Sequence, residues 1–139
     1  MPKPKAEAWK WCSKYIRLRD SIDYCRRAGL PLDTGIVQCC TCSAIKQWKY
    51  VDAGHFISRG SGGASGVYFD ERNIAAQCKI CNAFYQGRTQ EYRDYILNKY
   101  GQEVIDELNL KNKTNSYKGQ FLAIGLIYKQ MYEGLLAAI

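Results

Sequence analysis

The sequence predicts a mostly helical α+β fold, and three observations lead to this expectation. Apolar residues recur at steps of three and four in the N-terminal and C-terminal regions, which indicates amphipathic helices. Two Cys-x-x-Cys pairs lie 35 residues apart in the middle of the chain, with short β-type segments around them. The length of 139 residues suits one domain with one modest core. We therefore expect a single domain with a basic N-terminal helix in 1–34, a metal-binding core in 35–88 and a helical region in 89–139.

The expected elements are short strands between amphipathic helices whose ends are marked by glycine, proline or a capping serine. The helices cover residues 6–28, 89–100, 102–110 and 116–136, the last with Ser116 as its N-cap. The strands cover residues 35–39, 45–50 and 51–57, the last two forming a hairpin with the first. A flexible loop is expected at 58–66, which contains four glycines, and a polar linker at 109–115.

The final helix carries an apolar stripe at three- and four-residue steps. Its members are Tyr117, Phe121, Ile124, Tyr128, Met131 and Leu135. Such a stripe is typical of a helix packed on its own core, and it also occurs in helices that pair with a second copy. Both interpretations stay open.

The chain carries a formal charge of +7, most of it near the N-terminus. Residues 1–29 hold eight basic and three acidic side chains, so this segment contributes +5 and the other 110 residues only +2. A basic helix of this kind suits a polyanion such as DNA or RNA, although an ordinary solvated helix face looks similar. The predicted DNA contacts on this helix are Lys10, Lys14, Arg17 and Arg19.

The composition also argues against several classes of protein. Apolar residues make up 47% of the chain, which is typical of a globular rather than a disordered protein. No run of about 18 apolar residues is present, so we expect no membrane-spanning helix. The basic N-terminus is followed by no apolar run, so we expect no secretory signal and a cytoplasmic location. In that reducing compartment, seven cysteines favour metal binding over disulfides.

The two cysteine pairs predict a structural zinc site. The pairs Cys39-x-x-Cys42 and Cys78-x-x-Cys81 each let two thiolates reach one ion at about 2.3 Å, and together they complete a tetrahedron. Four cysteine ligands leave no open coordination position, so this zinc would be structural rather than catalytic. Cys40 is an alternative ligand to Cys39, but the spacing Cys40-x-Cys42 is less suited to placing two thiolates on one ion. The thiols expected to be free and partly buried are Cys12, Cys25 and Cys40.

The segment between the cysteine pairs contains residues with catalytic chemistry. His55, the only histidine in the chain, follows an expected strand and precedes the glycine-rich loop. A lone histidine is usually a satisfied surface or core residue, but a neutral imidazole can also act as the general base of phosphodiester hydrolysis. That reaction needs a divalent cation, and Mg²⁺ prefers carboxylate and amide oxygens. Asp52 and Asn82 carry such oxygens on either side of His55.

Four short motifs carry a family resemblance. They are Tyr15-Ile-Arg-Leu-Arg-Asp20, Asp52-Ala-Gly-His55-Phe-Ile-Ser-Arg59, Phe69-Asp-Glu-Arg-Asn73 and Gln77-Cys78-x-x-Cys81-Asn82. Together they resemble the phage NinG/Rap recombination proteins over residues 13–110. This resemblance implies a branched-DNA (Holliday-junction) endonuclease with an HNH motif. The arrangement is also similar to phage endonuclease VII, in which zinc knuckles frame an Asp/His pair and an Asn follows the last zinc cysteine.

The resemblance implies a role for each matching residue. His55 matches the general base of the HNH motif, and Asn73 matches the middle Asn that orients the base or supports the loop of the site. Asn82 matches the Asn that binds the catalytic metal. Asp52 is the first candidate for the metal-binding Asp.

The position of this aspartate departs from the usual HNH pattern. Asp52 lies three residues before His55, whereas HNH enzymes commonly carry the Asp directly before the histidine, where this chain has Gly54. Asp70 or Glu71 could therefore substitute for Asp52.

A second departure lies at Ala75. The resemblance implies a histidine near this position, shortly before the second cysteine pair, but the chain reads Asn73-Ile-Ala-Ala-Gln-Cys78. Either the position tolerates alanine, or the site is disabled. A disabling change would lower the rate by orders of magnitude and leave the zinc fold intact.

Arg59 and the tryptophans each have two interpretations. Beside the glycine-rich loop, Arg59 would either hold a phosphate through its guanidinium or lie free in solvent. Trp9, Trp11 and Trp48 would either stack on exposed bases at a junction or belong to the core.

Taken together, these residues predict a metal-dependent, structure-selective DNA endonuclease with a treble-clef-like ββα-metal (HNH) core. It would cleave branched recombination intermediates with Mg²⁺ or Mn²⁺ held by Asp52 and Asn82, in the cytoplasm of a bacterial host. Cleaving a four-way junction symmetrically needs two active sites, so we expect a homodimer. The alternatives are a non-catalytic zinc-structured nucleic-acid binding protein and a zinc domain that binds protein.

Overall fold

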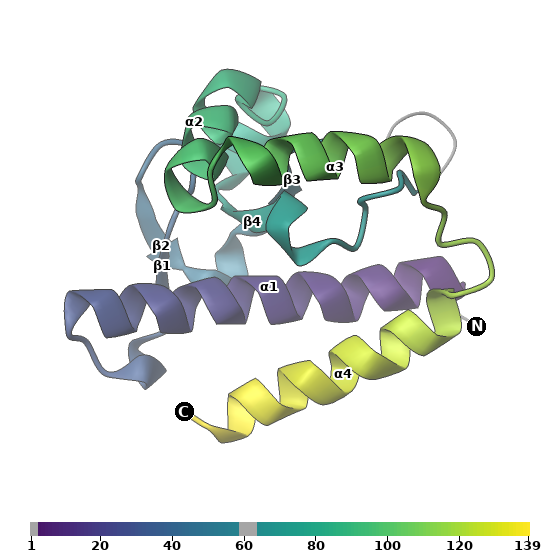
Figure 1. Cartoon of the computed structure of the whole chain (residues 1–139). Helices are drawn as coiled ribbons and strands as arrows, with labels where there is room; N and C mark the ends of the chain where they lie inside the picture. Colours follow the sequence, from purple (N-terminus) through teal and green to yellow (C-terminus); the bar gives the residue numbers. More distant parts are fainter. Residues whose placement is uncertain (1–2, 59–63) are drawn as a thin grey trace.

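The computed structural model describes residues 3–58 and 64–139, which form the mostly helical α+β protein that was predicted (Figure 1). The α-helices of this part are α1 Pro4–Ala28, α2 Thr89–Lys99, α3 Gln102–Thr114 and α4 Phe121–Ala137. The strands are β1 Ile36–Gln38, β2 Ile45–Gln47, β3 Asp52–His55 and β4 Ile74–Gln77. Single helical turns are η1 Leu32–Thr34, η2 Trp48–Tyr50, η3 Glu71–Asn73 and η4 Ile80–Phe84. Two antiparallel pairs result, β1 with β2 and β3 with β4.

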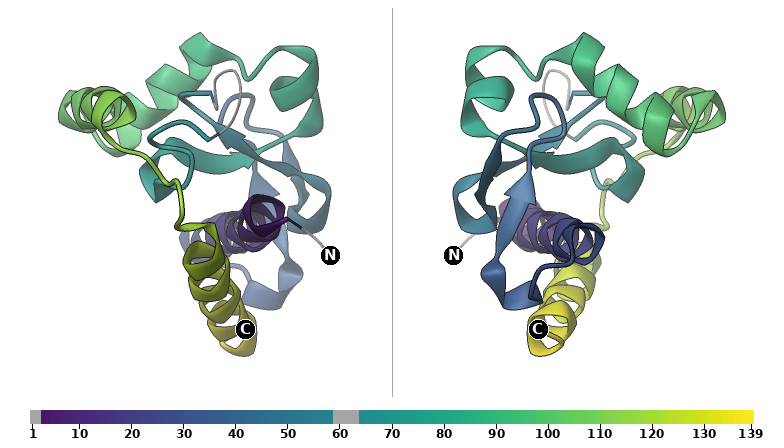
Figure 2. Two further views of the ribbon diagram at one scale, coloured as in Figure 1. Left: turned by 90° about the vertical axis from the view of Figure 1, so that its right-hand side faces the viewer. Right: turned by 90° about the vertical axis from the view of Figure 1, so that its left-hand side faces the viewer.

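Helix α1 is the central element of the fold. It lies between α4 on one side and the strands on the other (Figures 1 and 2). Pro4 suits its first turn, where a backbone N–H would have no helical partner, and the left-handed Gly29 at φ 70° ends it. Ala8 and Ile16 are fully buried between these layers, so α1 has apolar contacts on more than one side.

The apolar stripe of α4 faces α1. Tyr128 is buried and its hydroxyl donates to the carbonyl oxygen of Phe69 at 3.1 Å, while Phe121 and Ile124 pack on the same cluster. The stripe therefore packs on the core of its own chain. Ser116 does not cap the helix, which begins five residues later at Phe121. Among the described residues, no helix is both long and apolar enough to cross a membrane.

The β3–β4 pair divides two regions of the core. In this register His55 is opposite Ile74 and Gly54 is opposite Ala75. Since side chains alternate along a strand, His55 and Ile74 face α1, whereas Ala75 faces α2 and α3. A side chain at Gly54 would require the buried side chain of Gln77 to move, because an added Cβ would collide with its Oε1.

Two expected elements differ in the structure. The segment 51–57 was expected to pair with the first strands, but β3 pairs with β4, which was not predicted as a strand. The polar linker expected at 109–115 is mostly the last turn of α3. Leu108 is fully buried and Lys111 forms an ion pair with Asp70 at 3.0 Å, so tertiary contacts extend the helix through a polar sequence.

Candidate functional site

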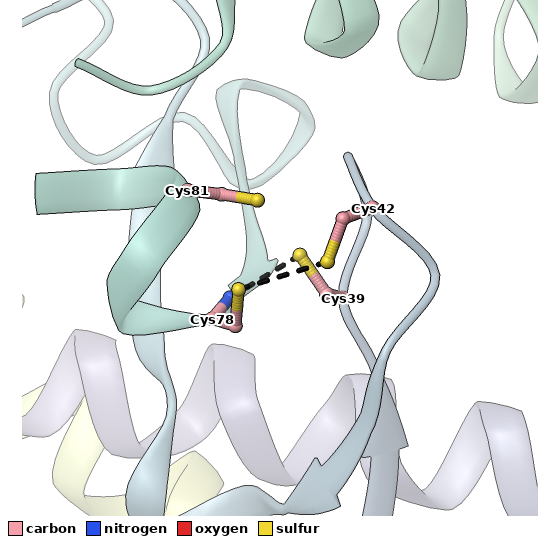
Figure 3. Close-up of side chains that lie close together, drawn as sticks. All are labelled: Cys39, Cys42, Cys78 and Cys81. Atoms are coloured by element: carbon pink, nitrogen blue, oxygen red, sulfur yellow. Dashed lines mark hydrogen bonds between the residues drawn. The ribbon is translucent and has the colours of Figure 1, made fainter. Parts of the chain in front are cut away.

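Four cysteine side chains converge between the two strand pairs. The sulfur atoms of Cys39, Cys42, Cys78 and Cys81 all lie within 4.8 Å of one another (Figure 3). The first two stand in the turn between β1 and β2, and the last two follow β4 and enter η4. The cluster therefore joins both strand pairs at one point. The predicted ligand set is the one that the fold brings together, and it could bind a metal such as zinc.

The surroundings of the cluster favour a thiolate at Cys39 and a thiol at Cys42. The backbone N–H of Cys78 donates to the sulfur of Cys39 at 3.2 Å, and Nε of Arg88 donates to the sulfur of Cys81 at 3.1 Å. Burial alone raises the pKa of Cys39, but hydrogen bonds led by that N–H lower it to about 6. Burial and neighbouring thiols raise the pKa of Cys42 to about 12. Four thiolates this close would repel one another, so the four thiols cannot all ionise without a cation. A bound divalent cation would balance the negative charges.

Cys40 is not part of this cluster. Its side chain packs with Tyr92 and its neighbours on the other side of β4, and burial raises its pKa well above the usual value. It therefore stays a thiol, and Cys39 is the better ligand, as the spacing predicted. Cys12 and Cys25 are buried elsewhere along α1.

A polar groove of about 640 Å³ lies beside the cluster. It is bounded by α1, β3 and η4, and its lining includes side chains from each of these elements. Among them are Trp9, Arg17, Asp52, His55, Lys79 and Asn82. Three residues that the sequence marked for catalysis or metal binding, Asp52, His55 and Asn82, thus meet in one place.

His55 ends strand β3 and is oriented by its neighbours. Its Nε2 lies 2.9 Å from the carbonyl oxygen of Tyr68, which can only accept, so this nitrogen carries the proton. In a neutral ring the lone pair then belongs to Nδ1. The rings of Trp9 and Tyr68 contact the imidazole with centroid distances of 4.7 and 4.6 Å. These contacts fix the direction in which the imidazole faces the groove.

Asp52 and Asn82 are in direct contact. The amide of Asn82 donates to one carboxylate oxygen of Asp52 at 3.0 Å, and the ammonium of Lys79 lies 2.7 Å from the other. Burial raises the pKa of Asp52, but these hydrogen bonds and the charges of Lys79 and Arg17 outweigh it, so the pKa lies below its ordinary range. An ionised carboxylate and an amide thus lie side by side, a donor set that suits a hard divalent cation.

Asn73 lies outside the groove. It is fully buried, its oxygen accepts from the N–H of Ile57 at 2.8 Å, and its amide donates to the carbonyls of Ile57 and Val67. Asn73 thereby ties together the two ends of the segment that runs from 57 to 67. Its role is to hold the loop that follows His55, which is one of the two roles that the resemblance implied.

The alternative acidic residues do not reach the groove. Asp70 is buried and bonds to Arg72 and Lys111, while the backbone and side chain of Glu71 contact Arg19 and Tyr128. Asp52 is therefore the predicted acidic residue that lines the same groove as His55.

We expect Asp70 to stabilise the fold at neutral pH and to lose this effect in acid. Burial alone raises its pKa, but hydrogen bonds from Arg72 and Lys111 lower it from 3.8 to about 2. Because the folded pKa lies below the unfolded one, the stabilisation is complete above about pH 4 and disappears as the pH falls toward about 2. The shift corresponds to about 2 kcal/mol. Asp70→Asn should lower the free energy of unfolding in urea by about that amount at neutral pH.

The exposed partner Glu107 provides a matched control for this prediction. It pairs with the same Arg72 but is 58% exposed, so Glu107→Gln should change stability by less than about 1 kcal/mol. A difference between wild type and Asp70→Asn that stayed constant from neutral pH down to about pH 3 would contradict the assignment.

The predicted DNA contacts on α1 lie in different environments. Arg17 lines the groove, and its guanidinium reaches the carbonyl oxygen of Trp48 at 3.4 Å. Lys10 and Lys14 lie over the ring of Trp11, with Nζ 4.7 and 5.0 Å from its centroid. None of the three is buried, and among the described residues Arg17 bonds through Nε and Nη1 but not through Nη2.

Arg19 is a structural residue instead. Its side chain is 20% exposed, and its guanidinium bonds to the carboxylate of Asp20 and to the carbonyl oxygens of Glu71 and Ile74. Its Nε is used within α1 and its two terminal nitrogens attach α1 to η3 and β4, so all three are occupied and the prediction of Arg19 as a DNA contact is corrected. The predicted phosphate contact Arg59 lies outside the described residues.

The side chain of Ala75 points away from that of His55, and Ala75 is not among the residues that line the groove. It is 1% exposed and packs with Tyr92, Ile96 and Ile105. A histidine here would enter this apolar cluster and would not face His55. The hypothesis that alanine at this position disables the site stays a prediction.

Two groove residues were not found from the sequence. Lys79 pairs with Asp52, and the carbonyl of Tyr68 orients His55. Of these two, only Lys79 could have been suggested by the sequence, because it stands inside the second cysteine pair, three residues before Asn82. Trp9, for which base stacking or core packing was expected, contacts His55 itself.

The fold and the site define a mostly helical α+β protein in which four cysteines are placed to bind a metal beside a polar groove. The chain belongs to the NinG family of bacteriophage proteins: the family model described as "Bacteriophage Lambda NinG protein" matches residues 3–135.

Curated relatives named "Protein ninG" match about half of the chain. The protein of Escherichia phage 933W is 40% identical over 70 residues, which is 50% of this chain and 33% of the relative. The protein of Enterobacteria phage H19B is 44% identical over 62 residues, which is 45% of this chain and 28% of the relative. The protein of Escherichia phage lambda is 38% identical over 70 residues, which is 50% of this chain and 33% of the relative. The matched part thus spans about a third of the relatives' length. No solved structure matches the chain.

Proposed function

We propose that this protein is a metal-dependent DNA endonuclease of the HNH kind that hydrolyses phosphodiester bonds in branched DNA. The observation that carries the proposal is the meeting of His55, Asp52 and Asn82 in one groove. A general base beside an ionised carboxylate and an amide is the combination that metal-assisted phosphodiester hydrolysis needs.

Each groove residue would have a distinct part in the reaction. His55 would accept a proton from the attacking water, while its bond to the carbonyl of Tyr68 holds the ring in place. Mg²⁺ or Mn²⁺, held by Asp52 and Asn82, would stabilise the charge on the phosphate and the leaving oxygen. Arg17 and Lys79, whose charges face Asp52, would bind neighbouring phosphate oxygens.

The local architecture supports an HNH-type core. Strands β3 and β4 followed by the turn η4 have the order of a ββα-metal core, with the base at the end of β3 and the amide ligand in η4. The cysteine cluster would bind zinc and brace this unit. A homodimer remains part of the proposal because paired cuts need two sites, and its interface would lie away from the stripe covered by α1.

The second candidate is a non-catalytic zinc-structured nucleic-acid binding protein. The observation in its favour is the ion pair between Lys79 and Asp52, which neutralises the carboxylate without a metal. The two candidates differ in whether DNA is cut when a divalent cation is added.

Asp52→Asn should abolish metal-dependent cutting while leaving the fold and DNA binding intact. Mutation of a residue that only supports a metal ligand typically lowers activity by about 10- to 100-fold. Loss of the charged ligand itself should lower the cleavage rate further, by more than about 100-fold. The measurement is nicking of supercoiled plasmid with Mg²⁺ or Mn²⁺. The metal-free arm omits the divalent ion rather than adding a chelator, so that the cysteine cluster keeps its metal.

Asp23→Asn is the matched control, since Asp23 is an exposed carboxylate of α1 that pairs with Arg27. It should nick at the wild-type rate. Equal rates for wild type and Asp52→Asn would contradict the assignment of Asp52. DNA binding by wild type without any nicking would favour the binding-protein candidate.

A further inference from the structure

The turn η4 presents a cluster of exposed apolar side chains at the rim of the groove. Phe84 is 85% exposed, Ile80 59% and Tyr85 54%. Residues 82–83 and 86–87 of the same segment line the groove itself. Single exposed apolar residues are ordinary, but a cluster of three beside a polar groove indicates a surface that meets a ligand.

This segment is braced rather than loose. Cys81 lies inside η4, and Arg88 donates to its sulfur while its guanidinium lies 4.0 Å from the centroid of the Tyr85 ring. Gln86 and Arg88 adopt left-handed backbone angles, φ 53° and 47°, which residues with a side chain rarely do unless their surroundings hold them. Phe84 and Tyr85 are therefore exposed on a backbone segment that is fixed to the cysteine cluster through Cys81 and Arg88.

The surface around these aromatic side chains is basic. Lys79 immediately precedes η4 with a side chain that is 66% exposed, and Arg17 and Lys49 line the groove that the segment borders. An apolar, aromatic rim beside a positive groove is complementary to a ligand with flat apolar faces joined by phosphates. Nucleic acid with unstacked bases has both features.

We propose that Phe84 and Tyr85 form a stacking platform for unpaired or unstacked bases, and that this platform gives the protein its preference for branched DNA over duplex. The inference rests on the proposed function of the groove. In a duplex the faces of the bases are covered by their neighbours, whereas a branch or a single-stranded segment exposes them. Stacking recognises any base, because every base has a flat π-face, so the preference is for structure and not for sequence.

The test compares DNA binding by wild type, Phe84→Ala, Tyr85→Ala and Phe84→Trp, measured by fluorescence anisotropy without divalent ions. The ligands are a four-way junction, a forked duplex with unpaired arms, and a linear duplex. Phe84→Ala should weaken binding to the junction and the fork about 5- to 100-fold and leave duplex binding within about twofold. Phe84→Trp keeps a flat aromatic side chain at this position, so it should keep the wild-type preference for the junction and the fork over the duplex.

Leu126→Ala is the matched control, because Leu126 is an apolar side chain that is 63% exposed on α4, on the other side of α1. It should bind all three ligands as wild type does. Equal weakening on all three ligands, or wild-type binding by both alanine variants, would overturn the platform. Because binding is measured without catalysis, a wild type that prefers the junction but never cuts it would refute the nuclease and leave the platform standing.

Discussion

Replacing Cys39 with alanine should unfold the core of this protein, whereas replacing the adjacent Cys40 should not. Cys39 belongs to the four-sulfur cluster that joins the two strand pairs, and Cys40 does not. Binding of structural zinc contributes about 10–16 kcal/mol in small zinc domains, which is as large as the whole net stability of about 5–15 kcal/mol of a typical domain. Loss of one ligand should therefore remove most of the folding free energy.

The two variants differ in what each thiol contacts. Cys40→Ala removes a sulfur that packs beside Tyr92, so its cost is a small cavity and about 1 kcal/mol. Zinc content by mass spectrometry, together with circular dichroism during heating, measures both effects. We expect one zinc per chain in wild type and Cys40→Ala. In Cys39→Ala we expect loss of zinc and no cooperative unfolding transition on heating. Native dichroism and an unchanged melting temperature in Cys39→Ala would show that the cluster does not hold the fold together.

Replacing His55 with alanine should lower the rate of DNA cleavage by about 10²- to 10⁴-fold, which is the usual contribution of a general base. The loss should appear in the rate at saturating DNA and not in the affinity, because the basic residues of the groove and of α1 stay in place. His55 is the only histidine in the chain, so no neighbouring imidazole can replace it.

A structural role of His55 can be separated from a catalytic one. The imidazole packs on Trp9 and Tyr68, so alanine leaves space there and should lower the melting temperature slightly. His55→Gln fills that space and has no basic nitrogen, so it should recover stability without recovering activity. Wild-type cleavage by His55→Gln would show that His55 only packs in this site.

The zinc ligands and the helices could be predicted because their signals are local. The spacing of Cys39, Cys42, Cys78 and Cys81 limits which thiols can share an ion, and glycine marked the end of α1. The partners of β3 could not be predicted in this way. Asp52 to His55 pair with a segment some twenty residues later, and the buried side chain of Asn73 bonds to Ile57 and Val67, which lie between the two strands in sequence.

Side-chain direction was the other feature that the sequence could not reveal. Arg17 and Arg19 stand two residues apart in one basic helix, yet the first lines the groove and the second bonds to buried carbonyls. Ala75 lies close in sequence to groove residues, but its side chain points away from that of His55 and packs with α2 and α3. In both cases the register of one element against another decides the role, and that register depends on long-range packing.

The most direct test of the proposed activity is cleavage of an end-labelled four-way junction, with a linear duplex of the same sequence as substrate control. The protein is first shown to be folded and loaded with zinc, and Mg²⁺ or Mn²⁺ is then added or omitted. We predict paired cuts near the branch, an intact duplex, and no cutting without the divalent ion. If folded, zinc-loaded protein binds the junction but cuts no DNA with either ion, the nuclease is contradicted and the groove belongs to a nucleic-acid binding protein.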